Sequence, residues 1–326
     1  MDTSARTKVS PRLFLFGALS WITAGALLTA GCLESANGSG VDSGGRGGSG
    51  ASSGQGGSGA DGNAGGFGGT IHIDDDAGNQ GSCAVGAEWI YLVDSNYSLL
   101  QFRPDSLTLT EIGRLSCPTS AGDTPFSMAV DRRARAWVLY QSGNIFHVDL
   151  ATSACTASGF APNQAGLRHF GMGFVSDDTG GGETLFVAGG GSVTNNATLA
   201  TIDTASLVLS PIGNLTGWPE LTGTGAAELW AFSPNTNPPT IQRLDKTSGA
   251  VAENYGLPSL TGSPSAWAFA FWGGSFYVFL QRASEPSTQI WHFNPDTQDL
   301  TRPLSNIGYR IVGAGVSTCA PLVPPA

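Results

Sequence analysis

The sequence predicts an all-β domain made of five copies of one structural repeat, preceded by a long glycine-rich segment. Three observations lead to this prediction. Short apolar blocks with an aromatic residue in second place recur at intervals of 46, 49, 44 and 47 residues. A second set of blocks alternates polar and apolar residues, and in a third set one face carries only small residues. Self-similarity at a period of about 40 to 50 residues is typical of repeat architectures.

Residues 1–31 have the pattern of an export signal. Three basic residues, Arg6, Lys8 and Arg12, precede a run from Leu13 to Leu33 that carries no charge. Glycine, serine and threonine residues dilute this run, and the next positive charge after it is Arg46. A membrane-spanning helix, which needs about 18 or more apolar residues, is therefore less well supported than a signal peptide.

The end of this segment resembles the cleavage site of bacterial lipoprotein signal peptides. Small residues, Ala30 and Gly31, stand directly before Cys32, although the leucine that this family prefers three residues before the cysteine is replaced by Thr29. The resemblance implies that Cys32 carries lipid chains and that a lipid bilayer is a partner. Leu33, in place of aspartate, implies the outer membrane of a Gram-negative cell. An uncleaved anchor in the inner membrane and plain secretion are the alternatives.

Residues 32–82 are predicted to form a disordered tether. From Gly38 to Gly69, 16 of 32 residues are glycine, and most of the others are small or polar. Such a composition cannot bury enough apolar surface to offset the entropy of ordering the chain. A flexible segment of about 50 residues spans roughly 40 Å, which would hold a folded domain away from a membrane.

The folded part is predicted to extend over residues 83–321, with 322–326 as a short tail. The wholly apolar blocks read as strands buried on both faces; they are Ile90–Val93, Ala136–Leu139, Leu185–Ala188, Leu229–Phe232 and Phe276–Phe279. Each is followed by a block with a polar second place, typical of a strand with one wet face; these are Leu100–Arg103, Phe146–Asp149, Ala200–Asp203, Gln242–Asp245 and Trp291–Asn294. Turn-forming residues and a more polar strand complete each repeat.

The third set of blocks indicates how the repeats are arranged. Glycine, alanine or serine occupies one face of each block; the five blocks are Ser127–Val130, Gly171–Phe174, Gly223–Ala226, Ala268–Phe271 and Gly313–Val316. Innermost strands that converge on a common axis would crowd one another and leave room only for small residues. The pattern resembles that of β-propellers, and it implies a five-bladed propeller of four-stranded blades without pointing to one propeller family.

The count of blocks also predicts how the propeller closes. No small-residue block precedes Ser127 in the folded part, so Gly313–Val316 must supply the innermost strand of the blade that the N-terminal strands begin. Apart from Cys32 the chain has four cysteines, which suits disulfides in an exported protein but allows three pairings. The closing strand favours Cys83 with Cys319, which leaves Cys117 with Cys155.

Five polar residues near the entries of the predicted inner strands are candidate ligand contacts: Arg168, His169, Glu220, Tyr309 and Arg310. His147 and His292 are not candidates, because they share the polar second place of the second block with other residue types. Trp218 and Trp272 lie outside the repeat pattern and are either exposed stacking platforms or filler between blades. No pair of acids suits catalysis by two carboxyl groups about 5 to 10 Å apart, so no catalytic residue is assigned.

Charge and composition restrict the partners further. The chain has 15 basic and 25 acidic residues, which argues against nucleic acid. No cysteines have C-x-x-C spacing and no histidine lies near a cysteine pair, so neither a metal site nor a cofactor is expected. We expect a monomer that binds a protein or glycan. The alternative is a hydrolase or lyase acting on carbohydrate or lactone-like substrates, with His169, Glu220 and Arg310 as its polar residues.

Overall fold

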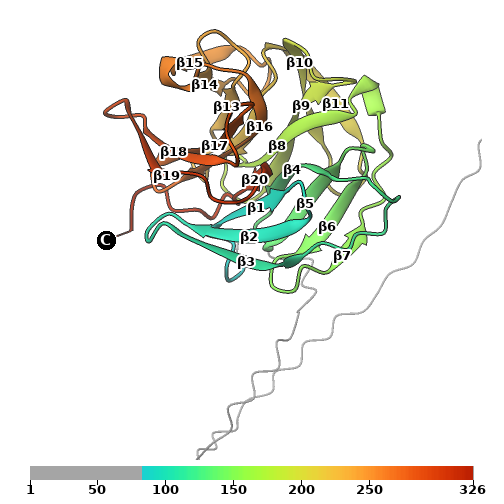
Figure 1. Ribbon diagram of the computed structural model, residues 1–326. Helices are drawn as coiled ribbons and strands as arrows, with labels where there is room; N and C mark the ends of the chain where they lie inside the picture. Colours follow the sequence, from blue (N-terminus) through green and yellow to red (C-terminus); the bar gives the residue numbers. More distant parts are fainter. Residues whose placement is uncertain (1–82, 326) are drawn as a thin grey trace, which may run out of the picture. The chain divides into compact units, whose positions relative to one another are not determined.

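The computed structural model describes residues 83–325. This part of the chain forms five four-stranded antiparallel sheets arranged around a common axis, as Figure 1 shows. The predicted five-bladed β-propeller is confirmed. The predicted signal peptide, the tether and Cys32 lie outside the described residues.

Each blade runs from an innermost strand at the axis to an outermost strand at the rim. The first blade contains, in that order, β20 (Ile311–Gly315), β1 (Ile90–Asp94), β2 (Ser98–Arg103) and β3 (Thr108–Arg114), and the second contains β4 (Pro125–Val130), β5 (Arg135–Tyr140), β6 (Ile145–Asp149) and β7 (Cys155–Ala157). The third blade contains β8 (His169–Ser176), β9 (Glu183–Gly190), β10 (Asn196–Ile202) and β11 (Leu209–Thr216), and the fourth contains β12 (Glu220–Gly223), β13 (Leu229–Ser233), β14 (Thr240–Leu244) and β15 (Val251–Gly256). The fifth blade contains β16 (Pro264–Trp272), β17 (Ser275–Arg282), β18 (Gln289–Asn294) and β19 (Asp299–Leu304).

Helical structure in residues 83–325 is limited to two 3-10 turns, η1 (Gln164–Gly166) and η2 (Pro258–Leu260). Neither is long enough to cross a membrane.

The small residues of the inner strands allow neighbouring blades to meet backbone against backbone. Each inner strand contacts the inner strands of both adjacent blades. A Cβ atom on Gly313 of β20 would lie 2.7 Å from the backbone nitrogen of Met128 in β4, and one on Gly173 would lie 2.9 Å from the Cα atom of Thr222. Real Cβ atoms do not approach other atoms so closely, so these positions require glycine.

One inner strand differs from the prediction. The small-residue block Gly223–Ala226 is not the strand of the fourth blade, because β12 begins at Glu220 and only Gly223 belongs to both. The rest of that block forms the tight turn into β13, in which Ala227 has a positive φ and donates its N–H to the carbonyl of Thr224. Turns and crowded inner strands both select small residues, and the pattern alone does not separate them.

The apolar core lies between the blades. Five hydrophobic clusters each join the facing sides of two adjacent blades. Trp218 and Trp272 are 1% and 5% exposed, so both are filler between blades. In every blade the aromatic residue of the second strand pairs across the sheet with the polar residue of the third; the pairs are Tyr91 with Gln101, Trp137 with His147, Phe186 with Thr201, Trp230 with Arg243 and Tyr277 with His292.

These pairings explain the two histidines as structural residues. The ring of His147 packs against Trp137 at a centroid distance of 4.3 Å, and burial lowers its pKa to about 4. His292 packs against Tyr277 at a centroid distance of 5.1 Å, with the two rings tilted.

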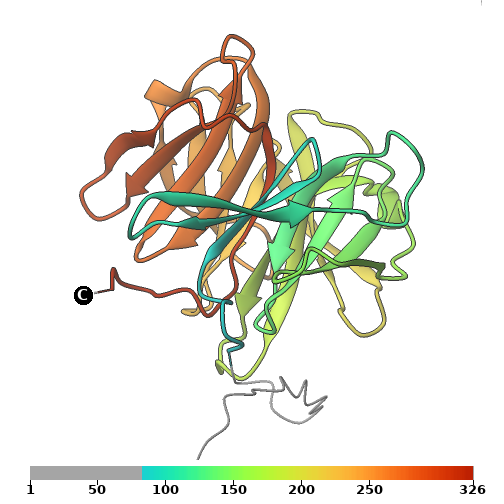
Figure 2. The same ribbon diagram turned by 60° about the horizontal axis from the view of Figure 1, so that its bottom comes forward.

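The ring closes as expected. Strand β20 pairs antiparallel with β1, with Tyr91 opposite Gly315. Disulfides join Cys83 to Cys319 and Cys117 to Cys155, with Cα–Cα distances of 5.9 and 4.9 Å. In Figure 2 the start of the described chain (cyan) and the C-terminal segment (dark red) both lie towards the lower end of the ring.

Candidate ligand pocket

A pocket of about 340 Å³ opens at the end of the ring where the inner strands begin, which we call the entry end. All five blades contribute to it, through the first residues of inner strands and through neighbouring loops. Its lining consists of Phe126, Gln141, Val193, Glu220, Asn235, Pro264, Ser265, Ala266, Trp267, Arg310 and Val312. Such a mostly apolar cavity with a few polar groups is typical of sites for small ligands.

Arg310 supplies the cationic group of the pocket. It directly precedes β20, and its guanidinium donates from Nη1 to Ser265 Oγ at 3.3 Å and from Nη2 to the backbone carbonyl of Ser265. Ser265 Oγ in turn donates to the carbonyl of Gln281 at 3.1 Å. No ion pair among residues 83–325 involves Arg310. Its charge is therefore held in place and free to meet an anion.

Glu220 is the single carboxylic acid in the lining, and its side chain links blades across the inside of the ring. Its side chain reaches from the fourth blade to the second, where Ser127 Oγ donates to Glu220 Oε2 at 2.9 Å. The backbone N–H of Met172 in the third blade donates to the same carboxyl group. Burial raises the pKa of Glu220 well above its usual range, because it disfavours the charged carboxylate.

Glu220 lies at the entry of an inner strand, as predicted, but it belongs to the strand itself instead of preceding it. Glu220 is the first residue of strand β12, and it is only 4% exposed. The shifted assignment of the fourth inner strand explains this difference.

Arg168 and His169 lie beside the pocket and support its wall. Arg168 Nε donates to the backbone carbonyl of Gln141 at 3.2 Å, and His169 Nε2 lies 2.9 Å from the same oxygen. The His169 ring packs against Phe126 at a centroid distance of 4.8 Å. Both residues thus hold two lining residues, Phe126 and Gln141, in position without lining the pocket themselves.

Tyr309 points away from the pocket. Its hydroxyl donates to Glu111 Oε2 in the outermost strand β3 at 2.9 Å, and this bond raises the pKa of Tyr309. Of the five candidate residues, the structure thus brings Glu220 and Arg310 into the lining, places Arg168 and His169 next to it, and separates Tyr309 from it.

Two aromatic residues of the pocket escaped the sequence analysis. Phe126 immediately precedes the small-residue block of the second blade, and Trp267 immediately precedes that of the fifth. An aromatic residue stands directly ahead of the small-residue block in three repeats, and this signal would have found both residues together with Phe170, which lies in the core between two blades.

At the opposite end of the ring a polar network surrounds Arg132, which together with Glu183 lines a pocket of about 360 Å³. Its guanidinium donates to Thr318 Oγ1 and to Ser176 Oγ, each at 2.5 Å, and Thr318 Oγ1 donates to Glu183 Oε2 at 2.9 Å. Burial raises the pKa of Glu183 to about 7. The network ties the second and third blades to the C-terminal segment.

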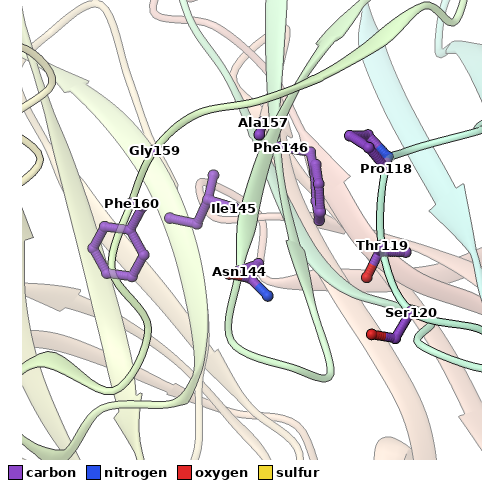
Figure 3. Close-up of a pocket in the computed structure, with 9 residues that line it drawn as sticks. All are labelled: Pro118, Thr119, Ser120, Asn144, Ile145, Phe146, Ala157, Gly159 and Phe160. Carbon is purple, nitrogen blue, oxygen red and sulfur yellow. The ribbon is translucent and has the colours of Figure 1, made fainter.

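A second pocket, of about 400 Å³, lies on the second blade and is shown in Figure 3. Phe146, Ile145 and Phe160 form its apolar part, and Thr119, Ser120 and Asn144 its polar part. None of its lining residues is ionisable. Within residues 83–325 no group of three or more His, Cys, Asp or Glu residues is arranged to hold a metal ion. The entry-end pocket, which contains ionisable groups, is therefore a stronger candidate site than the pocket on the second blade.

The buried carboxyl group of Glu220 gives a testable pH dependence. Its pKa is higher in the folded than in the unfolded chain, so its favourable contribution is complete below the unfolded pKa and is lost as the pH rises through the folded pKa. Glu220→Gln keeps the shape and removes the titration. As the pH rises above 4.5, the ordinary pKa of a glutamate, we expect the free energy of unfolding of the wild type to fall more steeply than that of Glu220→Gln, as measured by denaturant unfolding.

The control for this experiment is Asp299→Asn, which removes an exposed carboxylate of the outermost strand β19. It should retain the pH slope of the wild type. Identical slopes for the wild type and Glu220→Gln would contradict a carboxyl group whose pKa is raised by burial.

Comparisons with known proteins give distant likenesses of fold. No protein-family model matches the sequence, and no curated protein matches it either. Among solved structures, the nidogen/laminin complex is similar over 72% of this chain and 82% of that chain, with 13% identity and a TM-score of 0.44. TolB from Acinetobacter baumannii is similar over 67% of this chain and 52% of that chain, with 15% identity and a TM-score of 0.40. No ligand or activity is carried over from either.

Proposed function

We propose that the protein is an exported, lipid-anchored binding module that recognises a glycan or a protein through its entry-end pocket. The observation that carries the proposal is the convergence of all five blades on one cavity that holds a fixed, unpaired guanidinium. Few other polar groups line the cavity, as is usual for a site that binds and orients a ligand.

The positions of the chain ends support the anchored arrangement. Cys83, where the described chain begins, is bonded to Cys319, and Ala84 donates its N–H to the carbonyl of Arg132 at the end of the ring opposite the pocket. A tether that joins the domain there and ends at an acylated Cys32 would attach at the end of the ring opposite the pocket and leave the pocket open to ligands. A multiply acylated cysteine gives stable anchoring, which a single chain does not.

Binding is better supported than a hydrolase or lyase reaction on a carbohydrate or lactone-like substrate. A mechanism with two carboxyl groups needs a second acid about 5 to 10 Å from the first. The lining contains only Glu220, whose carboxyl group is already bonded to Ser127 and to the backbone of Met172.

Ligand capture tests the proposed function. The full chain with Cys32→Ser would be immobilised and exposed to an array of glycans and to purified cell-envelope proteins. We expect at least one ligand to bind and its binding to fall about tenfold or more in Trp267→Ala, because truncation of a half-buried aromatic residue in a pocket removes most of its contact area. Asp299→Asn, far out on β19, is the matched control. Equal binding to Trp267→Ala and the wild type, or binding of no ligand, would contradict the proposal.

Fatty-acid labelling tests the anchor. Expressed with an alkyne-tagged palmitate in a Gram-negative host, the full chain should incorporate the label and sediment with the outer membrane. Cys32→Ser should lose both properties, because Cys32 is the proposed acceptor. Label that persists in Cys32→Ser, or a soluble wild-type protein, would contradict lipidation at this residue.

A further inference from the structure

The charge around the entry-end pocket is opposite in sign to that of the whole chain. The chain carries an excess of acidic residues, with a formal net charge of −10. At the pocket, however, Arg310 lines the cavity, Arg168 holds the backbone of the lining residue Gln141, and the single acid is the buried Glu220. A local cationic site in an acidic protein selects for an anionic ligand.

The guanidinium of Arg310 is oriented so that it can pair with a carboxylate. A guanidinium has five N–H donors in a planar fork. The bonds from Nη1 and Nη2 to Ser265 fix the plane of the group and leave further N–H groups without a partner in residues 83–325. Arginine–carboxylate pairs of this kind are among the stronger hydrogen-bonded interactions, and they are specific in geometry.

The rest of the lining suits a compact ring rather than an extended chain. Phe126 and Trp267 present aromatic surface, and the side-chain amide of Gln141 makes no hydrogen bond within the described residues. The volume of about 340 Å³ lies at the lower end of the range for small-ligand sites. The apolar face of a sugar ring would pack on the aromatic side chains, and a hydroxyl group would meet the amide.

A peptide is less well accommodated. Peptides commonly bind by adding a strand to an exposed sheet edge, or by placing a terminal carboxylate in a nest of backbone N–H groups. The inner strands next to the pocket offer no such edge, because each is paired within its blade and packed against its neighbours. The polar groups of the pocket belong mainly to side chains.

We propose that the pocket binds a terminal, carboxylate-bearing sugar residue of the uronic acid type, with its carboxylate against Arg310 and its ring against Trp267 and Phe126. This inference rests on the proposed function and assigns its ligand class.

Calorimetric titration of the full Cys32→Ser chain tests the inference. The probes are sodium glucuronate, sodium galacturonate, the neutral methyl ester of glucuronic acid, and glucose. We expect at least one of the two uronates to bind, the ester and glucose to bind about tenfold or more weakly, and the uronate affinity to fall as salt is added. Arg310→Gln should weaken uronate binding by about 10- to 100-fold, as expected for loss of a hydrogen-bonded charge pair.

Arg133→Gln is the matched control. It removes the same charge from an exposed arginine whose side chain makes no hydrogen bond within the described residues, in the turn that follows β4 at the other end of the ring. It should bind like the wild type, and thermal unfolding would verify that both variants fold. Absence of uronate binding, equal binding of glucose, or equal losses in the two variants would overturn the inference.

The inference and the proposed function fail in different ways. A panel of short peptides with free and amidated C-termini forms the comparison arm. Peptide binding through Arg310 without uronate binding would reject the sugar ligand and leave a binding module. If no ligand is captured by the glycan array, the envelope proteins or these probes, both proposals fail.

Discussion

Close packing of the five inner strands is the constraint on which the rest of this structure depends. Neighbouring inner strands approach so closely that a single methyl group at Gly313 or Gly173 would overlap the backbone of the next blade. Side chains of ordinary size at these positions would force the blades apart, because close-packed interiors yield little to added volume. The narrow ring in turn brings the starts of five strands to one place, and the pocket is a consequence of that convergence.

Because the ring is narrow, polar side chains can link blades across it. Glu220 reaches Ser127 two blades away, and Thr222 Oγ1 accepts a hydrogen bond from the backbone N–H of Phe271 in the next blade at 3.1 Å. At the opposite end Arg132 connects two blades with the C-terminal segment. Because both ends are linked, the residues around the pocket are joined across blades, and the guanidinium of Arg310, at the end of the connection between β19 and β20, is oriented by its bonds to Ser265 of β16.

The fold could be predicted from the sequence because its causes are repeated five times. An aromatic strand, a half-polar strand and a small-residue strand recur, and closure by β20 follows from counting them. The site could be predicted only in part. Glycine and alanine mark both tight turns and crowded strands, so the predicted fourth inner strand began at Gly223, whereas the observed strand begins at Glu220. Tyr309 and Arg310 are neighbours in sequence but extend in different directions, and no pattern in one sequence specifies that divergence.

The stability of Gly313→Ala, compared with Gly181→Ala, tests the central claim most directly. A Cβ atom at Gly313 would meet backbone atoms of Ser127 and Met128 at 2.7 to 3.0 Å, whereas at Gly181 the nearest atom would be 3.9 Å away. Overpacking of this kind costs about 1–3 kcal/mol, so denaturant unfolding should show a loss of that size for Gly313→Ala and almost none for Gly181→Ala. Equal stability of the two variants would contradict a ring held at the limit of backbone contact.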